Sequence, residues 1–314
     1  MKRRWLLCGL GIVASAIALA APASDDSARE LGTVAWKRDF PAALAEAQAS
    51  GKPVLAVFQE VPGCATCVGF GEGALSHPLL VEGIETEFVP VLVYNNRGGA
   101  DAALLERFGE PSWNNPVVRF FDGEGRDVIA RRDRVYTSEA LAGRMRAALV
   151  AAGRTPPAYL GWVDPSARTP RGRVTLETHC FWEGEACIGG HPAVTATRAS
   201  WDAGAEVVEV WFDPATTTAA ELLAYAHAQG CGEKVVLHDP SQRPAAETAY
   251  GRAVRVSDTP PRPSKASDQK RHWKRSGYRA LPLTRFQQTR VNAALARGAD
   301  PRPWLSPRQR AALQ

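Results

Sequence analysis

Two cysteines, Cys64 and Cys67, directly follow an apolar run, and this placement restricts the fold more than any other feature of the chain. Residues 53–60 are too apolar for a surface strand, so we expect a central strand that is buried on both faces. A helix that begins at Cys64 would expose its sulfur to unpaired backbone N–H groups and to the positive end of the helix dipole. Both effects lower a thiol pKa, which makes Cys64 the predicted nucleophile and Cys67 the thiol that resolves a mixed disulfide.

The same cysteine spacing is compatible with half of a zinc site or with a structural disulfide. The sequence offers no second Cys-x-x-Cys pair and no His-x-x-x-His partner, so we expect no metal ion and no other cofactor. Binding of Cu(I) by the thiolates of Cys64 and Cys67 is kept as an alternative. The chain has only 2 methionines, which argues against a copper carrier of the Met-rich kind.

Apolar segments and helical patterns alternate over residues 33–152, which predicts one α/β domain. Asp39 can cap the first helix, and Gly51 can end it. The expected strands are 34–36, 53–60, 88–94, 117–121 and 128–130, and the expected helices are 40–50, 76–87, 101–108 and 138–152.

This domain resembles the thioredoxin superfamily, in particular its periplasmic thioredoxin-like members. The resemblance rests on Trp36, Asp39-Phe40, Ala43-Leu44, Gly51-Lys52-Pro53 and the pair Cys64 and Cys67. It implies that Pro116 is a cis-proline that faces the disulfide and contacts the substrate. Where the superfamily has an aromatic residue before the first cysteine, this chain has Val61-Pro62-Gly63, which points to a restricted partner.

A linker and a second unit follow. Residues 153–173 are rich in Pro, Gly and Arg and lack apolar periodicity, as expected of a domain boundary. We expect residues 174–258 to form a smaller α+β domain. Its expected strands are 174–178, 194–198, 206–212 and 234–237, and its expected helix is 218–229.

In this second unit Cys180 is followed directly by Phe181 and Trp182. Two bulky aromatic side chains would wall an apolar pocket beside a nucleophilic sulfur, and they would serve equally well as core residues beside an inert thiol. The sequence of these three residues alone does not separate the two interpretations.

A longer stretch resembles peptide methionine sulfoxide reductase A, over residues 178–185, 194–198 and 206–214. The resemblance implies that Cys180 attacks the sulfoxide sulfur and that Phe181 and Trp182 hold the substrate methyl group. It also implies that Glu206 protonates the sulfoxide oxygen, a role that suits a carboxyl group whose pKa is raised by burial.

The chain departs from that family at several positions. His179 stands in place of a glycine, Trp201 in place of a tyrosine, and the loop that carries a further oxygen-binding tyrosine is shortened to residues 202–205. Because donors to the oxygen are missing, a second domain that binds peptides without catalysis is kept as an alternative.

Two further cysteines, Cys187 and Cys231, are candidates for the thiol that resolves Cys180. Cys187 lies seven positions after Cys180, at roughly 10 Å along a regular helix, which is too far for a disulfide. Cys231 lies between Gly230 and Gly232 at the end of a predicted helix, so we expect it to be the resolving thiol.

Residues 1–23 are interpreted as a signal peptide. Three basic residues at 2–4 precede the apolar run 5–20, and small residues follow it. The run is shorter than the roughly 20 residues of a membrane-spanning helix, so we expect cleavage near Ala20 or Ala23. The mature protein would then be periplasmic or secreted, in an oxidising compartment.

The net charge of +5 is unevenly distributed. Residues 251–314 carry 15 Lys/Arg and 3 Asp/Glu, whereas residues 5–250 are net acidic. A folded body that is acidic is not typical of a nucleic-acid-binding domain. We expect the basic extension 259–314 to form a solvated helix against the second domain, with weak contact to anionic lipid head groups as an alternative role.

Together these patterns predict an exported enzyme, a thiol-disulfide oxidoreductase in which Cys64 and Cys67 pass electrons to a site around Cys180. Its partners would be an oxidised protein or peptide substrate and an upstream thiol reductant. The alternatives are a peptide-binding protein without catalysis and a metal chaperone.

Overall fold

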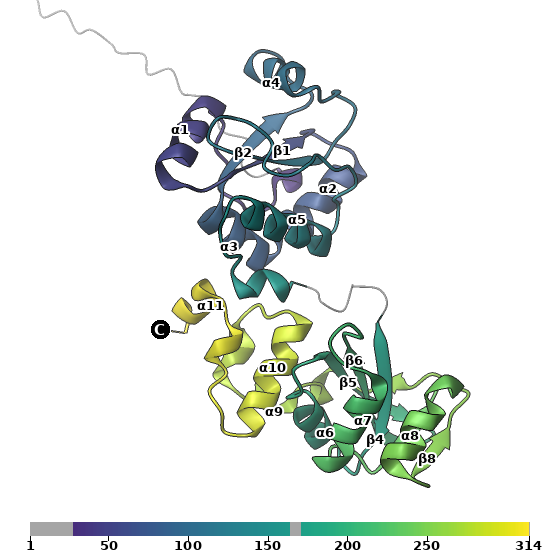
Figure 1. The fold of residues 1–314 in the computed structure, drawn as a ribbon. Coiled ribbons are helices and arrows are strands. Elements are labelled where there is room, and N and C mark those ends of the chain that lie inside the picture. Colours follow the sequence, from purple (N-terminus) through teal and green to yellow (C-terminus); the bar gives the residue numbers. More distant parts are fainter. Residues whose placement is uncertain (1–27, 164–170, 314) are drawn as a thin grey trace, which may run out of the picture.

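The computed structural model describes residues 28–163 and 171–313 (Figure 1). The predicted signal peptide, residues 1–23, lies outside the described residues, as does part of the predicted linker. Within the described ranges, no helix has both the length and the apolar character needed to cross a membrane.

A three-stranded sheet forms the centre of the first unit. Strand β1 (Val54–Gln59) pairs in parallel with β2 (Val89–Tyr94) and antiparallel with β3 (Val117–Phe121). Leu55 of β1 packs in one apolar cluster and Phe58 in another, because successive side chains of a strand point to opposite faces. The predicted central strand, buried on both faces, is therefore confirmed.

Helices cover both faces of this sheet. The clusters place α3 and α5 on one face and α1 and α4 on the other, as Figure 1 shows. As predicted, the Asp39 carboxylate caps α1 by accepting from the Ala42 N–H at 2.9 Å. The helices are η1 (Arg29–Leu31), α1 (Phe40–Ser50), α2 (Ala65–Glu72), η2 (Ala74–Ser76), α3 (Pro78–Glu87), α4 (Ala100–Phe108), α5 (Ser138–Ala151) and η3 (Ala158–Gly161).

Two predicted strands of this unit are wrong. Residues 34–36 form no strand, because the Ala35 N–H donates to the Glu85 carboxylate at 2.8 Å instead of to a ladder. Residues 128–130 form no strand either: among the described residues the hairpin has a single bridge, between Phe121 and Asp127, and the Val128 N–H donates to the Phe120 carbonyl at 2.9 Å. The Ala130 carbonyl then accepts from the Arg144 guanidinium. At Ala35 and at Ala130 a side chain takes the backbone group that a strand neighbour would have used.

The second unit contains a six-stranded sheet in the order β8-β7-β4-β6-β5-β9. Its inner part follows the split β-α-β-β-α-β arrangement, which agrees with the predicted α+β class. The strands are β4 (Gly172–Glu177), β5 (Val194–Asp202), β6 (Ala205–Phe212), β7 (Lys234–Leu237), β8 (Val254–Val256) and β9 (Arg262–Pro263). The helices are α6 (Phe181–Ile188), α7 (Ala219–Ala228), η5 (Pro240–Gln242) and α8 (Arg243–Tyr250).

The basic extension is folded rather than solvated. Its helices are η6 (Ala266–Asp268), α9 (Arg271–Lys274), η7 (Gly277–Ala280), α10 (Arg285–Ala296), η8 (Arg302–Trp304) and α11 (Pro307–Ala311). Arg290 of α10 is only 3% exposed and donates to backbone carbonyls of the second unit, among them that of Val194 at 2.8 Å. The extension therefore wraps the second unit, as expected, but two of its basic residues, Lys270 and Arg290, are buried and satisfy buried acceptors.

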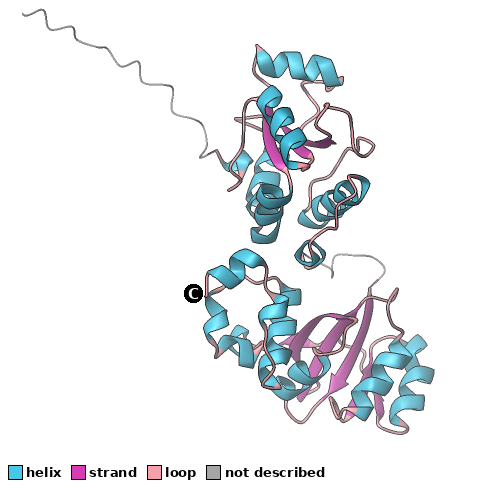
Figure 2. Ribbon diagram, turned by 60° about the vertical axis from the view of Figure 1, so that its left-hand side comes forward, coloured by secondary structure: helices cyan, strands magenta, loops and turns pink. Residues whose placement is uncertain are grey.

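The extension also contacts the first unit. Figure 2, in which helices are cyan, shows its helices beside the sheet of the second unit, with the C-terminal end of the chain facing the helices of the first unit. Trp162, which follows η3, lies 6.4 Å from Phe286 and 6.1 Å from Trp304, measured between ring centroids. Arg308 of α11 forms an ion pair with Glu85 of α3 at 2.6 Å.

Candidate functional site

Cys64 and Cys67 lie at the start of α2, immediately after β1. Cys64 is the N-cap residue and is exposed, whereas Cys67 is fully buried. Their sulfur atoms are 3.6 Å apart, so the two thiols can form a disulfide with little movement. The structure therefore brings together the two residues that the sequence assigned to one redox site.

The two thiols have opposite acidities. A hydrogen bond from the backbone N–H of Cys67 lowers the pKa of Cys64, because it stabilises the thiolate at the helix start. Burial first, and then the hydrogen bond with the Cys64 side chain, raise the pKa of Cys67 to about 11. At neutral pH the exposed sulfur is thus the better nucleophile, and the buried sulfur stays protonated.

The segment before Cys64 is held tightly. The N–H of Gly63 donates to the Glu30 carboxylate at 2.8 Å, and the side chain of Asn96 bonds the backbone of Val61. A Cβ atom on Gly63 would lie 2.3 Å from the carbonyl oxygen of Glu60. Only glycine fits this close approach, which accounts for one residue of the Val-Pro-Gly segment.

Asn115 is a site residue that was not predicted from the sequence. Its amide oxygen accepts from the Cys67 thiol at 2.8 Å. The following residue, Pro116, has the cis peptide bond that the family resemblance implied. Because Pro116 was expected beside the cysteine pair, the position before it was the available signal for Asn115.

Glu60 extends the list of groups that could contact a ligand. One ligand atom each from Glu60, Cys64 and Cys67 lies within 4.8 Å of the others. Two thiolates and a carboxylate form a donor set for a borderline or soft metal ion. This is the arrangement on which the metal-chaperone alternative depends.

In the second unit, Cys180 and Glu206 meet at the start of α6. Cys180 is the N-cap residue and half-buried. The Thr178 N–H bonds the Glu206 carbonyl at 2.9 Å, which places Glu206 beside the end of β4. The Glu206 carboxylate then accepts from the Phe181 N–H at 2.7 Å. The structure thus brings the predicted nucleophile and the predicted acid to one helix start.

The aromatic residues after Cys180 differ in their surroundings. Phe181 is 4% exposed and packs edge-on against Trp201, with ring centroids 5.5 Å apart, so it is a core residue. Trp182 is half-buried, and the guanidinium carbon of Arg271 lies 3.6 Å from its ring centroid. The core interpretation of Phe181 is therefore supported, and the extension covers part of Trp182.

The structure does not pair Cys231 with Cys180. Cys231 forms a disulfide with Cys187, with Cα atoms 5.3 Å apart, and Cys180 is a free thiol. The structure holds Cys231 away from Cys180, because the end of α7 lies against the last turn of α6 rather than its first. Cys187, passed over as a partner for Cys180, is instead the partner of Cys231.

The two thiol sites lie well apart. Figure 1 shows α2 in the upper unit and α6 in the lower unit. The contacts that join the units run through Trp162 and Arg308 rather than through either cysteine site.

Comparison with known proteins assigns the class of the first unit. Residues 35–123 match a family model described as thioredoxin-like. They form a thioredoxin-like domain, of the type found in thiol-disulfide oxidoreductases. The match ends before the second unit, and no curated protein matches the chain.

The solved structures that are similar to the chain include the following two. One is a DsbH oxidoreductase, with 17% identity and a TM-score of 0.33, covering 37% of this chain and 85% of its own. The other is a thioredoxin from Thermus thermophilus, with 24% identity and a TM-score of 0.33, covering 38% of this chain and 90% of its own.

Proposed function

We propose that the protein is an exported thiol-disulfide oxidoreductase that reduces disulfides of proteins or peptides through Cys64 and Cys67. The observation that carries this proposal is the asymmetry of the pair, an exposed thiol of lowered pKa 3.6 Å from a buried thiol of raised pKa. Export rests on the sequence pattern of residues 1–23 alone.

The reaction exchanges one disulfide for another. The Cys64 thiolate attacks a sulfur of the client disulfide, so the client S–S bond breaks and a mixed disulfide forms. The released client thiolate takes a proton from solvent. Cys67 then loses its proton and attacks the Cys64 sulfur, which releases the second client thiol and leaves a Cys64–Cys67 disulfide. An external thiol reductant returns two electrons to the pair.

Reduction of insulin disulfides by the purified protein, with dithiothreitol as electron donor, tests this function. We expect Cys64→Ser to abolish turnover and Cys67→Ser to accumulate a mixed disulfide that reductant releases. Cys180→Ser is the matched control and should leave turnover unchanged. If the wild type reduces no disulfide but binds Cu(I) with one ion per Cys64–Cys67 pair, the metal-chaperone alternative replaces this proposal.

A second function is favoured by the geometry at Cys180. We propose that this site reduces methionine sulfoxide, since the Glu206 carboxylate reaches the start of α6 where Cys180 lies. Cys180 would attack the sulfoxide sulfur while Glu206 gives a proton to the oxygen. Methionine then leaves, and Cys180 is left as a sulfenic acid. A thiol condenses with the sulfenic acid to a disulfide and releases water.

A methionine sulfoxide peptide, assayed with dithiothreitol, separates this function from simple peptide binding. Cys180→Ser should abolish reduction, and Glu206→Gln should lower kcat while the far-UV spectrum is unchanged. Cys64→Ser serves as the control, because dithiothreitol bypasses the first unit. Peptide binding without turnover in the wild type would favour the non-catalytic alternative.

The two sites would be coupled if Cys64 reduces a disulfide of the second unit. A tether of about 20 residues gives an effective concentration near the millimolar range once the sites can meet. In the structure the reducible bond is Cys187–Cys231, so Cys231 as the thiol that resolves Cys180 would first have to be released from Cys187. Peptide mapping of Cys67→Ser after mild oxidation should show Cys64 joined to Cys231. Cys64 joined only to glutathione or to other proteins would contradict this coupling.

A further inference from the structure

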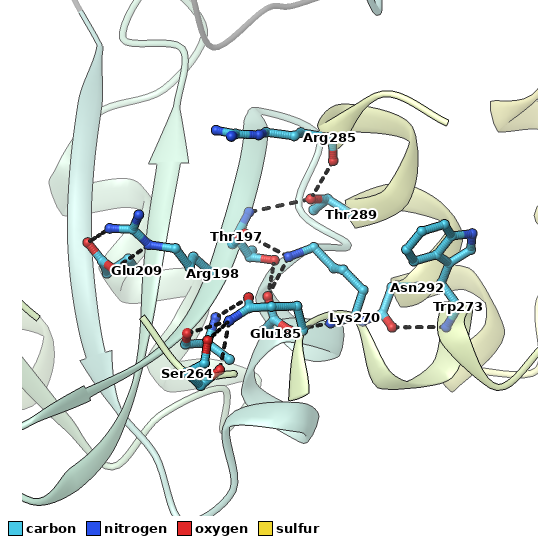
Figure 3. Close-up of polar contacts among 12 residues, drawn as sticks. Glu185, Thr197, Arg198, Glu209, Ser264, Lys270, Trp273, Arg285, Thr289 and Asn292 are labelled. Carbon is cyan, nitrogen blue, oxygen red and sulfur yellow. Dashed lines mark hydrogen bonds and ion pairs between the residues drawn. The ribbon is translucent and has the colours of Figure 1, made fainter. Parts of the chain in front are cut away.

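A cavity lies between the second unit and the extension, away from both cysteine sites. It has a volume of about 430 Å³, and its walls come from β5, β6 and residues 263–288. This volume falls within the range of small-molecule sites, which is about 300–1,000 Å³. Figure 3 shows this region, with the sheet on one side and α10 on the other.

The lining of the cavity is positively charged. Arg171, Arg198, Lys270 and Arg285 line it, and the lining contains no acidic residue. Two of these charges are balanced from beneath the surface. The buried Glu209 carboxylate binds Arg198 through bonds of 2.7 and 2.9 Å, and the buried Glu185 carboxylate pairs with Lys270 at 2.5 Å.

Arg285 differs from these two residues. Among the described residues its guanidinium has no ion pair and no hydrogen-bond acceptor, and its side chain is exposed. Figure 3 shows this side chain extended from the start of α10 towards the sheet, above Arg198. The guanidinium of Arg285 is therefore free to pair with a ligand in the cavity. The buried carboxylates of Glu209 and Glu185 pair with Arg198 and Lys270 instead.

The opposite wall offers an aromatic surface. Trp211 of β6 lines the cavity and is half-buried, and the Arg198 guanidinium carbon lies 5.1 Å from its ring centroid. Planar groups stack favourably on such a ring and on the guanidinium beside it. A ligand that combines a planar apolar part with a negative group would use both features.

The base of the cavity is rigid. Lys270 has a left-handed backbone with φ of 51°, a conformation that disfavours residues other than glycine. Its N–H and its ammonium group both bond Glu185, which holds this geometry. A site that is formed before the ligand arrives loses less entropy on binding.

We propose that this cavity binds a small organic anion, whose negative group pairs with Arg285 and whose planar apolar part lies against Trp211. The ligand class is an aromatic phosphate or carboxylate. The proposal rests on this cavity alone and does not depend on the redox activity of either cysteine site.

Isothermal titration calorimetry on the full-length protein at fixed ionic strength tests the proposal, with phenyl phosphate, benzoate, inorganic phosphate and phenol as probes. We expect phenyl phosphate or benzoate to bind more tightly than inorganic phosphate and phenol, and the comparison of the two aromatic anions identifies the preferred negative group. Arg285→Gln should raise the Kd of the preferred probe about tenfold, the effect of losing one charge-assisted hydrogen bond.

Arg279→Gln is the matched control, because it removes the same charge from an exposed position of the extension that does not line the cavity. Its Kd should equal that of the wild type. Trp211→Leu should remove the preference for an aromatic anion over inorganic phosphate. The proposal is overturned if no aromatic anion binds at millimolar concentration, if phenol binds as tightly as phenyl phosphate, or if Arg285→Gln and Arg279→Gln behave alike.

Discussion

At the scale of single residues, the position of a sulfur atom decides its chemistry. Cys64 and Cys67 are three residues apart, yet one is exposed at a helix start and the other is fully buried. The backbone N–H of Cys67 lowers the pKa of Cys64, whereas burial raises that of Cys67 to about 11. This difference suits Cys64 to act as the nucleophile and Cys67 to act as the resolving thiol.

Alkylation against pH measures this asymmetry. Below the lowered pKa of Cys64 both thiols are protonated and react slowly. As the pH rises through that value, iodoacetamide should label Cys64, while Cys67 stays unlabelled until the pH approaches 11. In the unfolded chain iodoacetamide should label both cysteines with a common apparent pKa of about 8.5. A common value in the folded protein would contradict the assigned roles.

The placement of Trp113 also implies a role. Its side chain is 80% exposed, and it lies two positions before Asn115, which bonds Cys67. We expect Trp113→Ala to lower kcat/KM for a protein disulfide about tenfold, through lost contact with the client. Reduction of a small aromatic disulfide should be unchanged. Val150→Ala, at a 63% exposed position, is the control, and equal losses on both substrates would contradict a docking role.

At the scale of elements, the Cys187–Cys231 disulfide joins α6 to the end of α7. Its two cysteines are 44 positions apart in the sequence, and Cys231 is only 2% exposed. A crosslink of this span stabilises a fold by up to about 4 kcal/mol, mainly by restricting the unfolded chain.

Replacement of both cysteines by serine should therefore lower the free energy of unfolding of the second unit by about 2–4 kcal/mol. Denaturant unfolding, monitored through the hydrogen exchange of the β4 and β6 amides, would measure this change. Cys180→Ser, which removes a thiol outside the disulfide, is the control. An unchanged midpoint would show that the bond has no structural role and would favour a purely redox role.

Elements whose signal lies in a few consecutive residues were predictable from the sequence. The Asp39 cap of α1 depends on neighbouring residues alone. The strand β1 was predicted from its continuous apolar run, although its ladder partners in β2 and β3 are distant in sequence. The edge of β5 was not predictable, because residues distant in sequence cover it. The Gln269 amide bonds both the N–H and the carbonyl of Ala199, and Lys270 bonds the Thr197 carbonyl.

The same distinction between local and long-range information applies to the candidate site. Cys64 and Cys67 belong to a local pattern and could be found in the sequence, and Pro116 was implied by the family resemblance. Asn115 could be placed only through the position of the cis-proline next to it. The pairing of Cys187 with Cys231 depends on how α7 packs on α6, and no spacing in the sequence contains that information.

At the scale of the whole molecule, the extension is the structural link between the two units. Its own residues Phe286 and Trp304 lie around Trp162, and Arg308 pairs with Glu85. The ion pair is partly exposed, so it contributes little, about 0–1 kcal/mol. Each aromatic contact is worth about 0.5–1.5 kcal/mol beyond its buried area. The aromatic cluster around Trp162 therefore dominates this link.

Trp162→Ala should loosen the link without unfolding either unit. We expect faster hydrogen exchange in α11 and at the facing residues of α3, and a larger radius of gyration by X-ray scattering. Trp113→Ala removes an indole of the same size from an exposed position and should change neither quantity. Since α2 and α6 lie well apart in Figure 1, the link also holds the two thiol sites apart.

Loosening this link should then favour electron transfer between the units. In a Cys67→Ser background, Trp162→Ala should increase the yield of Cys64 joined to Cys231, because the sites can meet more often. Faster exchange together with an unchanged yield would mean that Cys64 serves external clients only. Unchanged exchange in α11 and α3 would instead refute the role assigned to Trp162.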